Sequence, residues 1–168
     1  TVGSIGNATS LRTIFSGGGS YDLQVTGNLF GPTGQAGMRH ETSGTVSGNT
    51  NIQNNVIRSP AQSAIELVLD SAPNNQVNIQ GNLIELVGSR GVSIDADGTK
   101  TASIRNNIIN ETGSSAVFLE TTGSGFVLNG ADEGDNLYND ATPIPFTAVI
   151  AMPPVGGDGI RINGTKYP

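Results

Sequence analysis

Residues Val77–Ile94 read VNIQGNLIELVGSRGVSI, and this stretch holds the repeating unit of the chain. Asn82 stands three residues after one branched apolar residue and two before another, and a small residue follows it after nine positions. The same arrangement surrounds Asn28, Asn55 and Asn107, at steps of 27, 27 and 25 residues (55 − 28, 82 − 55 and 107 − 82). A sustained period of this length indicates a solenoid, in which each coil stacks on the one before it.

Four columns of residues, one repeat apart, are almost entirely apolar. Alternate side chains of a strand point to the same face, so we expect these columns to point inward and fill a narrow core. The exception is His40, which we interpret as a hydrogen-bonded residue inside the core rather than a catalytic base. The columns are Val25, Ile52, Ile79 and Ile104; Phe30, Ile57, Ile84 and Ile109; Met38, Ile65, Val92 and Val117; and His40, Leu67, Ile94 and Leu119.

The repeated asparagine is expected to form a structural ladder at a corner of each coil. Asparagine tolerates a positive φ better than most non-glycine residues, so we predict that conformation for it here. Stacked side-chain amides can also donate to and accept from one another between coils. The ladder is predicted to comprise Asn28, Asn55, Asn82 and Asn107.

A leucine-rich repeat also carries such an asparagine, but it needs a leucine eight residues earlier. Those positions hold Ser20, Ser47, Asn74 and Thr99 in this chain. The segments after each asparagine alternate with period two, which is typical of strands rather than of a helix. A parallel β-helix therefore fits the pattern better.

The pattern I-x-x-N-x-I followed by G/A-I-x-I, at Ile52–Leu67, Ile79–Ile94 and Ile104–Leu119, resembles that of the parallel β-helix proteins of the pectin-lyase-like superfamily. The resemblance implies an all-β fold, a right-handed single-stranded parallel β-helix of about six coils of 25–27 residues. That superfamily includes polysaccharide lyases, glycoside hydrolases, phage tailspikes and adhesins, so the resemblance leaves the function open.

The chain divides into three parts by the regularity of the repeat. We predict an incomplete first coil over 1–20, with a corner or loop at 16–20, and regular coils over 21–125. An irregular terminal coil is predicted over 126–168. The whole is expected to be one structural domain and a fragment of a longer protein.

Two later segments look like returns of the repeat. The NLY sequence beginning at Asn136 resembles the NLI corner, and GIRI at 159–162 resembles the GVSI strand. These two segments lie 23 residues apart (159 − 136) instead of nine. We therefore predict a proline-rich excursion of roughly 14 residues between them, which would be a cap or a partner contact.

Composition excludes some classes of function. The net charge of −6 argues against a nucleic-acid surface, which requires clustered lysines and arginines. The chain has no cysteine, and no apolar run approaches the ~20 residues of a membrane-spanning helix. We expect an extracellular, cell-surface or virion location.

Acidic residues occupy neighbouring outward positions of one predicted sheet. Asp95 and Glu120 would face each other across one coil step, and like charges at that distance raise one pKa or recruit a cation. We take Asp95, Asp97 and Glu120 as candidate Ca²⁺ ligands. Together with Glu66 they are also candidate catalytic carboxylates, as in glycosidases.

Features that the resemblance would imply for an enzyme are missing. The chain has no Asp-Asp pair, no Arg-x-Lys, no tryptophan and no outward histidine, and we expect no basic residue beside the acids. Our main hypothesis is a rigid surface module for structural display, adhesion or glycan recognition, with a glycan, a larger chain or a second copy of itself as partner. The alternatives are a polysaccharide-processing β-helix, such as a tailspike depolymerase, and a filament subunit stacked through its open ends.

Overall fold

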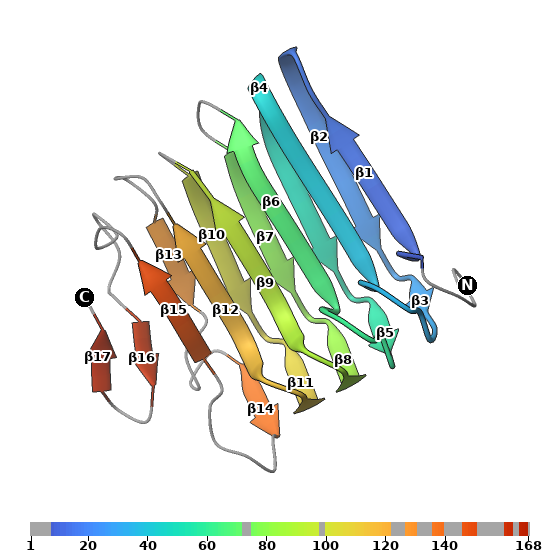
Figure 1. The fold of residues 1–168 in the computed structure, drawn as a ribbon. Helices are drawn as coiled ribbons and strands as arrows, with labels where there is room; N and C mark the ends of the chain where they lie inside the picture. Colours follow the sequence, from blue (N-terminus) through green and yellow to red (C-terminus); the bar gives the residue numbers. More distant parts are fainter. Residues whose placement is uncertain are drawn as a thin grey trace.

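The protein is a parallel β-solenoid of about four turns (Figure 1). The described residues form only strands and their connections, and no helix among them is long and apolar enough to cross a membrane. The computed structural model describes residues 8–71, 75–97, 100–121, 127–130, 136–139, 146–150, 160–162 and 165–167.

Each coil contributes one strand to each of three faces, and strands one repeat apart pair in parallel. Two faces are joined because the long strand β4 belongs to both of them. The first face contains β1 (Leu11–Phe15), the first half of β4 (Met38–Gln53), β6 (Ile65–Ser71), β9 (Arg90–Ala96), β12 (Ser115–Thr121) and β15 (Phe146–Ile150).

The remaining strands build the other two faces. The second face contains β2 (Gly18–Thr26), the second half of β4, β7 (Asn75–Gln80), β10 (Lys100–Arg105) and β13 (Val127–Gly130). The third contains β3 (Leu29–Phe30), β5 (Val56–Arg58), β8 (Leu83–Val87), β11 (Ile108–Thr112) and β14 (Leu137–Asn139).

The core lies between the three faces and consists of the four columns predicted from the repeat. The register pairs Val25 with Ile52, Ile52 with Ile79, and Ile79 with Ile104, and the other columns align in the same way. All sixteen column residues are buried, with exposed fractions between 0% and 4%. Because every outward position is separated from the next by an inward one, each face presents its own set of surface columns.

β4 turns from the first face to the second without interrupting its strand. The bend is at Gly44, which has a φ of 79°. Gly44 stacks on Gly17 of the preceding coil, which has a φ of 92°. A Cβ on Gly44 would lie 2.6 Å from the Gly17 carbonyl oxygen, so only glycine fits there. The loop predicted at 16–20 is therefore too long, since Gly18 already begins β2 and pairs with Thr45.

The asparagine corner differs from our prediction in one respect. The residues with positive φ are Gly27, Asn54, Gly81 and Asn106, each directly before a ladder asparagine. The ladder asparagines are not among the residues with positive φ, and their side-chain amides point into the coil. The left-handed conformation of the preceding residue makes the corner.

The predicted register beyond Asn136 is wrong. β15 continues the first face, with Phe146 paired to Val117, so the count from asparagine to strand is unchanged (146 − 136 and 117 − 107 are both 10). The segment predicted to continue that face instead belongs to β16 (Ile160–Ile162), which pairs antiparallel with β17 (Thr165–Tyr167). Thus part of the predicted excursion is a regular strand, and the rest lies outside the described residues.

Candidate functional site

The asparagine ladder is structural. The side-chain oxygen of Asn82 accepts hydrogen bonds from the backbone N–H and the side-chain Nδ2 of Asn55, both at 3.0 Å. Its own Nδ2 donates to the Asn107 side-chain oxygen at 2.9 Å and to the Ile52 carbonyl at 2.9 Å. The same pattern links Asn28 to Asn55 and continues to Asn136. These buried amides are satisfied by the protein, which leaves none of their capacity for a ligand.

His40 is buried in the inward column, as predicted, and its ring nitrogens have protein partners. Nδ1 lies 2.8 Å from the Thr13 hydroxyl, and Nε2 lies 3.3 Å from the Tyr21 hydroxyl. The Phe15 ring packs against it edge-on at 5.7 Å. Burial lowers the pKa of His40 to about 4, with the Glu41 charge opposing that shift. A neutral imidazole enclosed in this way is part of the core.

A chain of ion pairs crosses the N-terminal coils on the first face. Glu41 accepts from Arg12 at 2.7 Å and from Arg39 at 2.8 Å, and Arg39 also bonds Glu66 at 2.8 Å. Hydrogen bonds from the two guanidinium groups hold the pKa of Glu41 below its usual value. The register places Arg39 next to Glu66 on the following coil. Because Glu66 is engaged by an arginine, it is a poor candidate for a catalytic acid.

The acidic surface, defined by Glu66, Asp70, Asp95, Asp97 and Glu120, lies on the first face and at its edge. Asp95 pairs with Glu120 in the register, as predicted, and Asp97 follows the end of β9. Partial burial of its carboxyl, then the charges of Asp70, Glu120, Asp97 and Glu66, raise the pKa of Asp95. Burial and the neighbouring charges thus both disfavour the ionised form of Asp95.

Lys100 corrects the expectation that no basic residue accompanies these acids. It begins β10 in an inward column and is 1% exposed. Burial lowers its pKa, whereas the charges of Asp97 and Asp70 raise it. Lys100 is therefore an inward cation whose pKa, lowered by burial, is partly restored by two of these acids, Asp97 and Asp70.

The three candidate metal ligands do not form a preformed site. Among the described residues, no three His, Cys, Asp or Glu side chains are grouped in a way that could hold a metal ion. Asp95 and Glu120 point outward from adjacent strands, whereas Asp97 lies past the strand end. Calcium binding at these residues would require them to rearrange.

Replacing Asp95 with asparagine is expected to leave the free energy of unfolding equal or up to about 1 kcal/mol higher at pH 7. The raised pKa means that folding disfavours the charged form, so the gain should vanish as the pH falls through that pKa. Denaturant midpoints at pH 7 and pH 3.5 measure this, with Glu111→Gln as the control at an exposed acid elsewhere. A loss of stability, or of a Ca²⁺-dependent rise in Tm, would instead make Asp95 part of a site.

The aromatic side chains on the described coils offer no open stacking platform for a sugar. Tyr21 points inward, stacks on Phe15 at 4.6 Å and hydrogen-bonds Thr50. Phe118 points outward, but the Arg90 guanidinium covers its ring at 3.4 Å. Sugar stacking on either ring would first require an existing contact to break.

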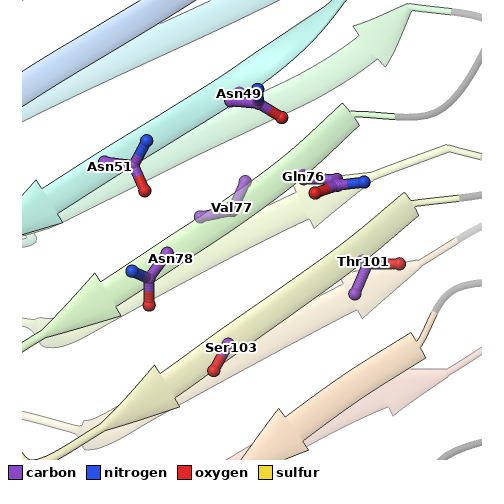
Figure 2. Close-up of a pocket in the computed structure, with 7 residues that line it drawn as sticks. All are labelled: Asn49, Asn51, Gln76, Val77, Asn78, Thr101 and Ser103. Atoms are coloured by element: carbon purple, nitrogen blue, oxygen red, sulfur yellow. The ribbon is translucent and has the colours of Figure 1, made fainter.

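A different surface combines exposure with unused hydrogen-bonding groups. We call it the amide surface, and Figure 2 shows its side chains next to one another on β4, β7 and β10. None of them hydrogen-bonds another side chain within the described coils, in contrast to the ladder amides. They enclose a shallow hollow of about 360 Å³, which Val77 closes from the core side. The amide surface consists of Asn49, Asn51, Gln76, Asn78, Thr101 and Ser103.

Two adjacent outward columns produce this surface. Asn49, Gln76 and Thr101 are aligned by the register, as are Asn51, Asn78 and Ser103 two residues further along. The change from amides to the shorter Thr101 and Ser103 creates the hollow. These residues were not predicted from the sequence because uncharged amides form no motif. They occupy the outward positions three residues and one residue before each inward Ile or Val of the second face. A comparison of those two positions between coils would have identified them.

Comparison with known proteins adds no assignment, since no protein-family model, no curated protein and no solved structure matches this chain. The function is therefore argued from the geometry of its surfaces.

Proposed function

We propose that this chain is a rigid extracellular or virion-surface module that recognises an uncharged glycan through the amide surface. The observation that carries the proposal is two aligned columns of three uncharged polar side chains that hydrogen-bond no other side chain among the described residues. Amides and hydroxyls can both donate and accept, which is what the hydroxyls of a sugar require. The hollow of about 360 Å³ is within the range of small-ligand sites.

The charge of this surface favours a neutral ligand over an acidic one. A uronate or a sulfated sugar would need lysine or arginine, and none lines the hollow. Its coils are held in fixed register by the ladder and by inter-strand hydrogen bonds, so a polymer would meet a preorganised array. Preorganisation reduces the entropy lost on binding, which suits a surface with modest individual contacts.

The experiment is a binding titration of the whole chain with uncharged, uronate-containing and sulfated polysaccharides. We expect binding to an uncharged polymer, and we expect Asn51→Ala combined with Asn78→Ala to weaken it at least about tenfold. Gln62→Ala removes an exposed amide from a different corner and should leave the affinity unchanged. Equal binding by the double variant and the parent would exclude the amide surface, and preference for acidic polymers would contradict the proposed chemistry.

A polysaccharide-processing role is the second candidate, favoured by the raised pKa of Asp95 among other carboxylates. A protonated carboxyl beside ionised ones could act as a general acid. A reducing-end assay on capsular polysaccharides tests it, and cleavage that disappears in Asp95→Asn would replace the binding role by catalysis. End-to-end stacking into filaments is a weaker candidate, based on the strand edges that end coils expose.

The hand of the solenoid, its number of coils and its kinship are also proposals. We infer a right-handed coil because connections between parallel strands of one sheet are right-handed in almost all proteins. The six-coil count, kinship with the pectin-lyase-like superfamily and membership of a larger chain are proposed on the repeat pattern. A density map of the intact protein would test hand and coil number, and antibody labelling of unpermeabilised cells or virions would test the location.

A further inference from the structure

The third face carries an apolar stripe, defined as Leu29, Val56, Leu83 and Ile108. These four residues point outward and are aligned by the register of β3, β5, β8 and β11. Leu29 is 41% exposed and Ile108 is 40% exposed. An outward column of a solvated sheet is normally polar, and a contiguous exposed apolar patch marks an interaction site.

Two further columns lie next to the stripe, both on the side toward the C-terminal ends of the strands. Arg58 and Glu85 lie two residues beyond Val56 and Leu83 and form an exposed ion pair at 2.7 Å. The next column holds Ser59 and Leu86, both with a φ of 55°. Leu86 is 56% exposed, although a bulky residue is costly both at positive φ and in water. A partner that covered Leu86 would remove one of those two costs.

We propose that a second copy of this chain docks on the third face, with the two solenoids antiparallel. The two-fold axis runs along the strand direction, midway between β5 and β8. This rotation places each column opposite the same column of the second copy and reverses the order of the coils. Such a contact is isologous, and it gives a closed dimer. The inference is independent of the proposed glycan site, which lies on the second face.

Each column then meets a complementary group on the second copy. Val56 faces Leu83 of the second copy, Arg58 faces Glu85, and the small Ser59 faces the exposed Leu86. Each relation is repeated by the symmetry. The contact therefore pairs apolar with apolar, positive with negative, and small with large.

The charges also select this orientation over the other in-plane two-fold axis. An axis along the solenoid that passes through the charged column would place Arg58 on Arg58 and Glu85 on Glu85, and facing like charges are unfavourable. The antiparallel arrangement instead produces a ring of four alternating charges around the centre of the contact. A second copy carries the complementary pattern of charges on successive coils, whereas a glycan or an unrelated protein does not carry it by symmetry.

The size of the face sets the expected strength. Four strands and three columns span roughly 14 Å by 10 Å, far below the ~800 Å² per partner of a stable interface. A free pair should therefore be weak. Several copies held on one surface would associate more strongly, because tethering raises their effective concentration.

Sedimentation velocity from about 10 µM to about 1 mM protein tests the proposal. We expect the parent to form a reversible dimer, and R58E alone or E85R alone to associate at least about tenfold more weakly. An equal mixture of these two variants should recover association at or above the parent level. In the mixed pair, two acids on one copy face two bases on the other, so all contacts across the interface are attractive.

The mixture distinguishes this contact from a general effect on folding, since each variant alone lacks the internal pair and the mixture does not restore it. Circular dichroism confirms that each variant is folded, and Gln80→Lys, at an exposed position of the second face outside the amide surface, should associate like the parent. A parent that stays monomeric at about 1 mM would overturn the proposal. So would a mixture that associates no better than its components, because the contact would then lie elsewhere or not exist.

Discussion

Replacing Asn82 with alanine is expected to lower the free energy of unfolding by about 3 kcal/mol. The substitution removes the acceptor of two hydrogen bonds from Asn55 and the donor to Asn107 and to the Ile52 carbonyl. Asn82 and both neighbouring ladder asparagines are 1% exposed, so water does not reach the groups that are left. Each buried polar group without a partner costs about 1–3 kcal/mol, partly offset by local relaxation.

The matched control is the same substitution at the start of the ladder. Asn28 is half-buried, and its side-chain oxygen accepts no hydrogen bond within the described residues, so Asn28→Ala should cost less than about 1 kcal/mol. Urea denaturation of the parent and both variants measures the difference. Equal midpoints for Asn82→Ala and Asn28→Ala would mean that the inner ladder bonds do not stabilise the solenoid.

The core was predictable because every coil of a solenoid repeats the same inward positions and the same corners. Each inward position must be apolar and each corner must bend, so the period of Ile52, Ile79 and Ile104 determines the strand register directly. The corner conformation was assigned to the wrong residue, although the correct signal was present. In all four coils the residue before the ladder asparagine is glycine or asparagine, the two types that accept a positive φ most readily.

The error beyond Asn136 has a similarly simple cause. The position nine residues after each earlier ladder asparagine holds glycine or alanine, whereas Pro145 stands at that place here. The prediction relied on the GIRI motif, but the strand begins at the usual number of residues after the ladder asparagine. In a stacked array the register is fixed by the coil beneath, so spacing is a better guide than residue type.

The surfaces were harder to predict than the core. The acids at 66, 95 and 120 were found because charge is conspicuous in a sequence, whereas Lys100, whose pKa is lowered by burial and raised by the charges of Asp97 and Asp70, was missed. Lys100 occupies an inward position aligned with Asn75 and Gly48, outside the four apolar columns of the repeat. The amide surface was missed for the opposite reason, since its residue types are common in turns. Its significance comes only from their alignment and their lack of internal partners.

Replacing His40 with leucine is expected to remove a large acid-dependent loss of stability. The pKa of His40 falls from 6.5 to about 4 on folding, so the neutral form is favoured in the native state. Its contribution is therefore complete above pH 6.5 and is lost as the pH falls through 4. This shift makes the parent lose about 3 kcal/mol between pH 7 and pH 4 through this residue alone.

Leucine should fit because Leu67, Ile94 and Leu119 occupy the same column in the next coils. At pH 7 we expect His40→Leu to change stability by no more than about 1 kcal/mol, since the half-buried Thr13 and Tyr21 hydroxyls can turn to water. Urea midpoints at pH 7, 5.5 and 4 for parent, His40→Leu and Glu41→Gln measure the effect. Glu41→Gln should keep most of the loss, because its arginine partners hold the pKa of Glu41 below the usual value of 4.5. If His40→Leu loses as much stability as the parent between pH 7 and pH 4, the acid sensitivity arises elsewhere and His40 is not a buried neutral imidazole.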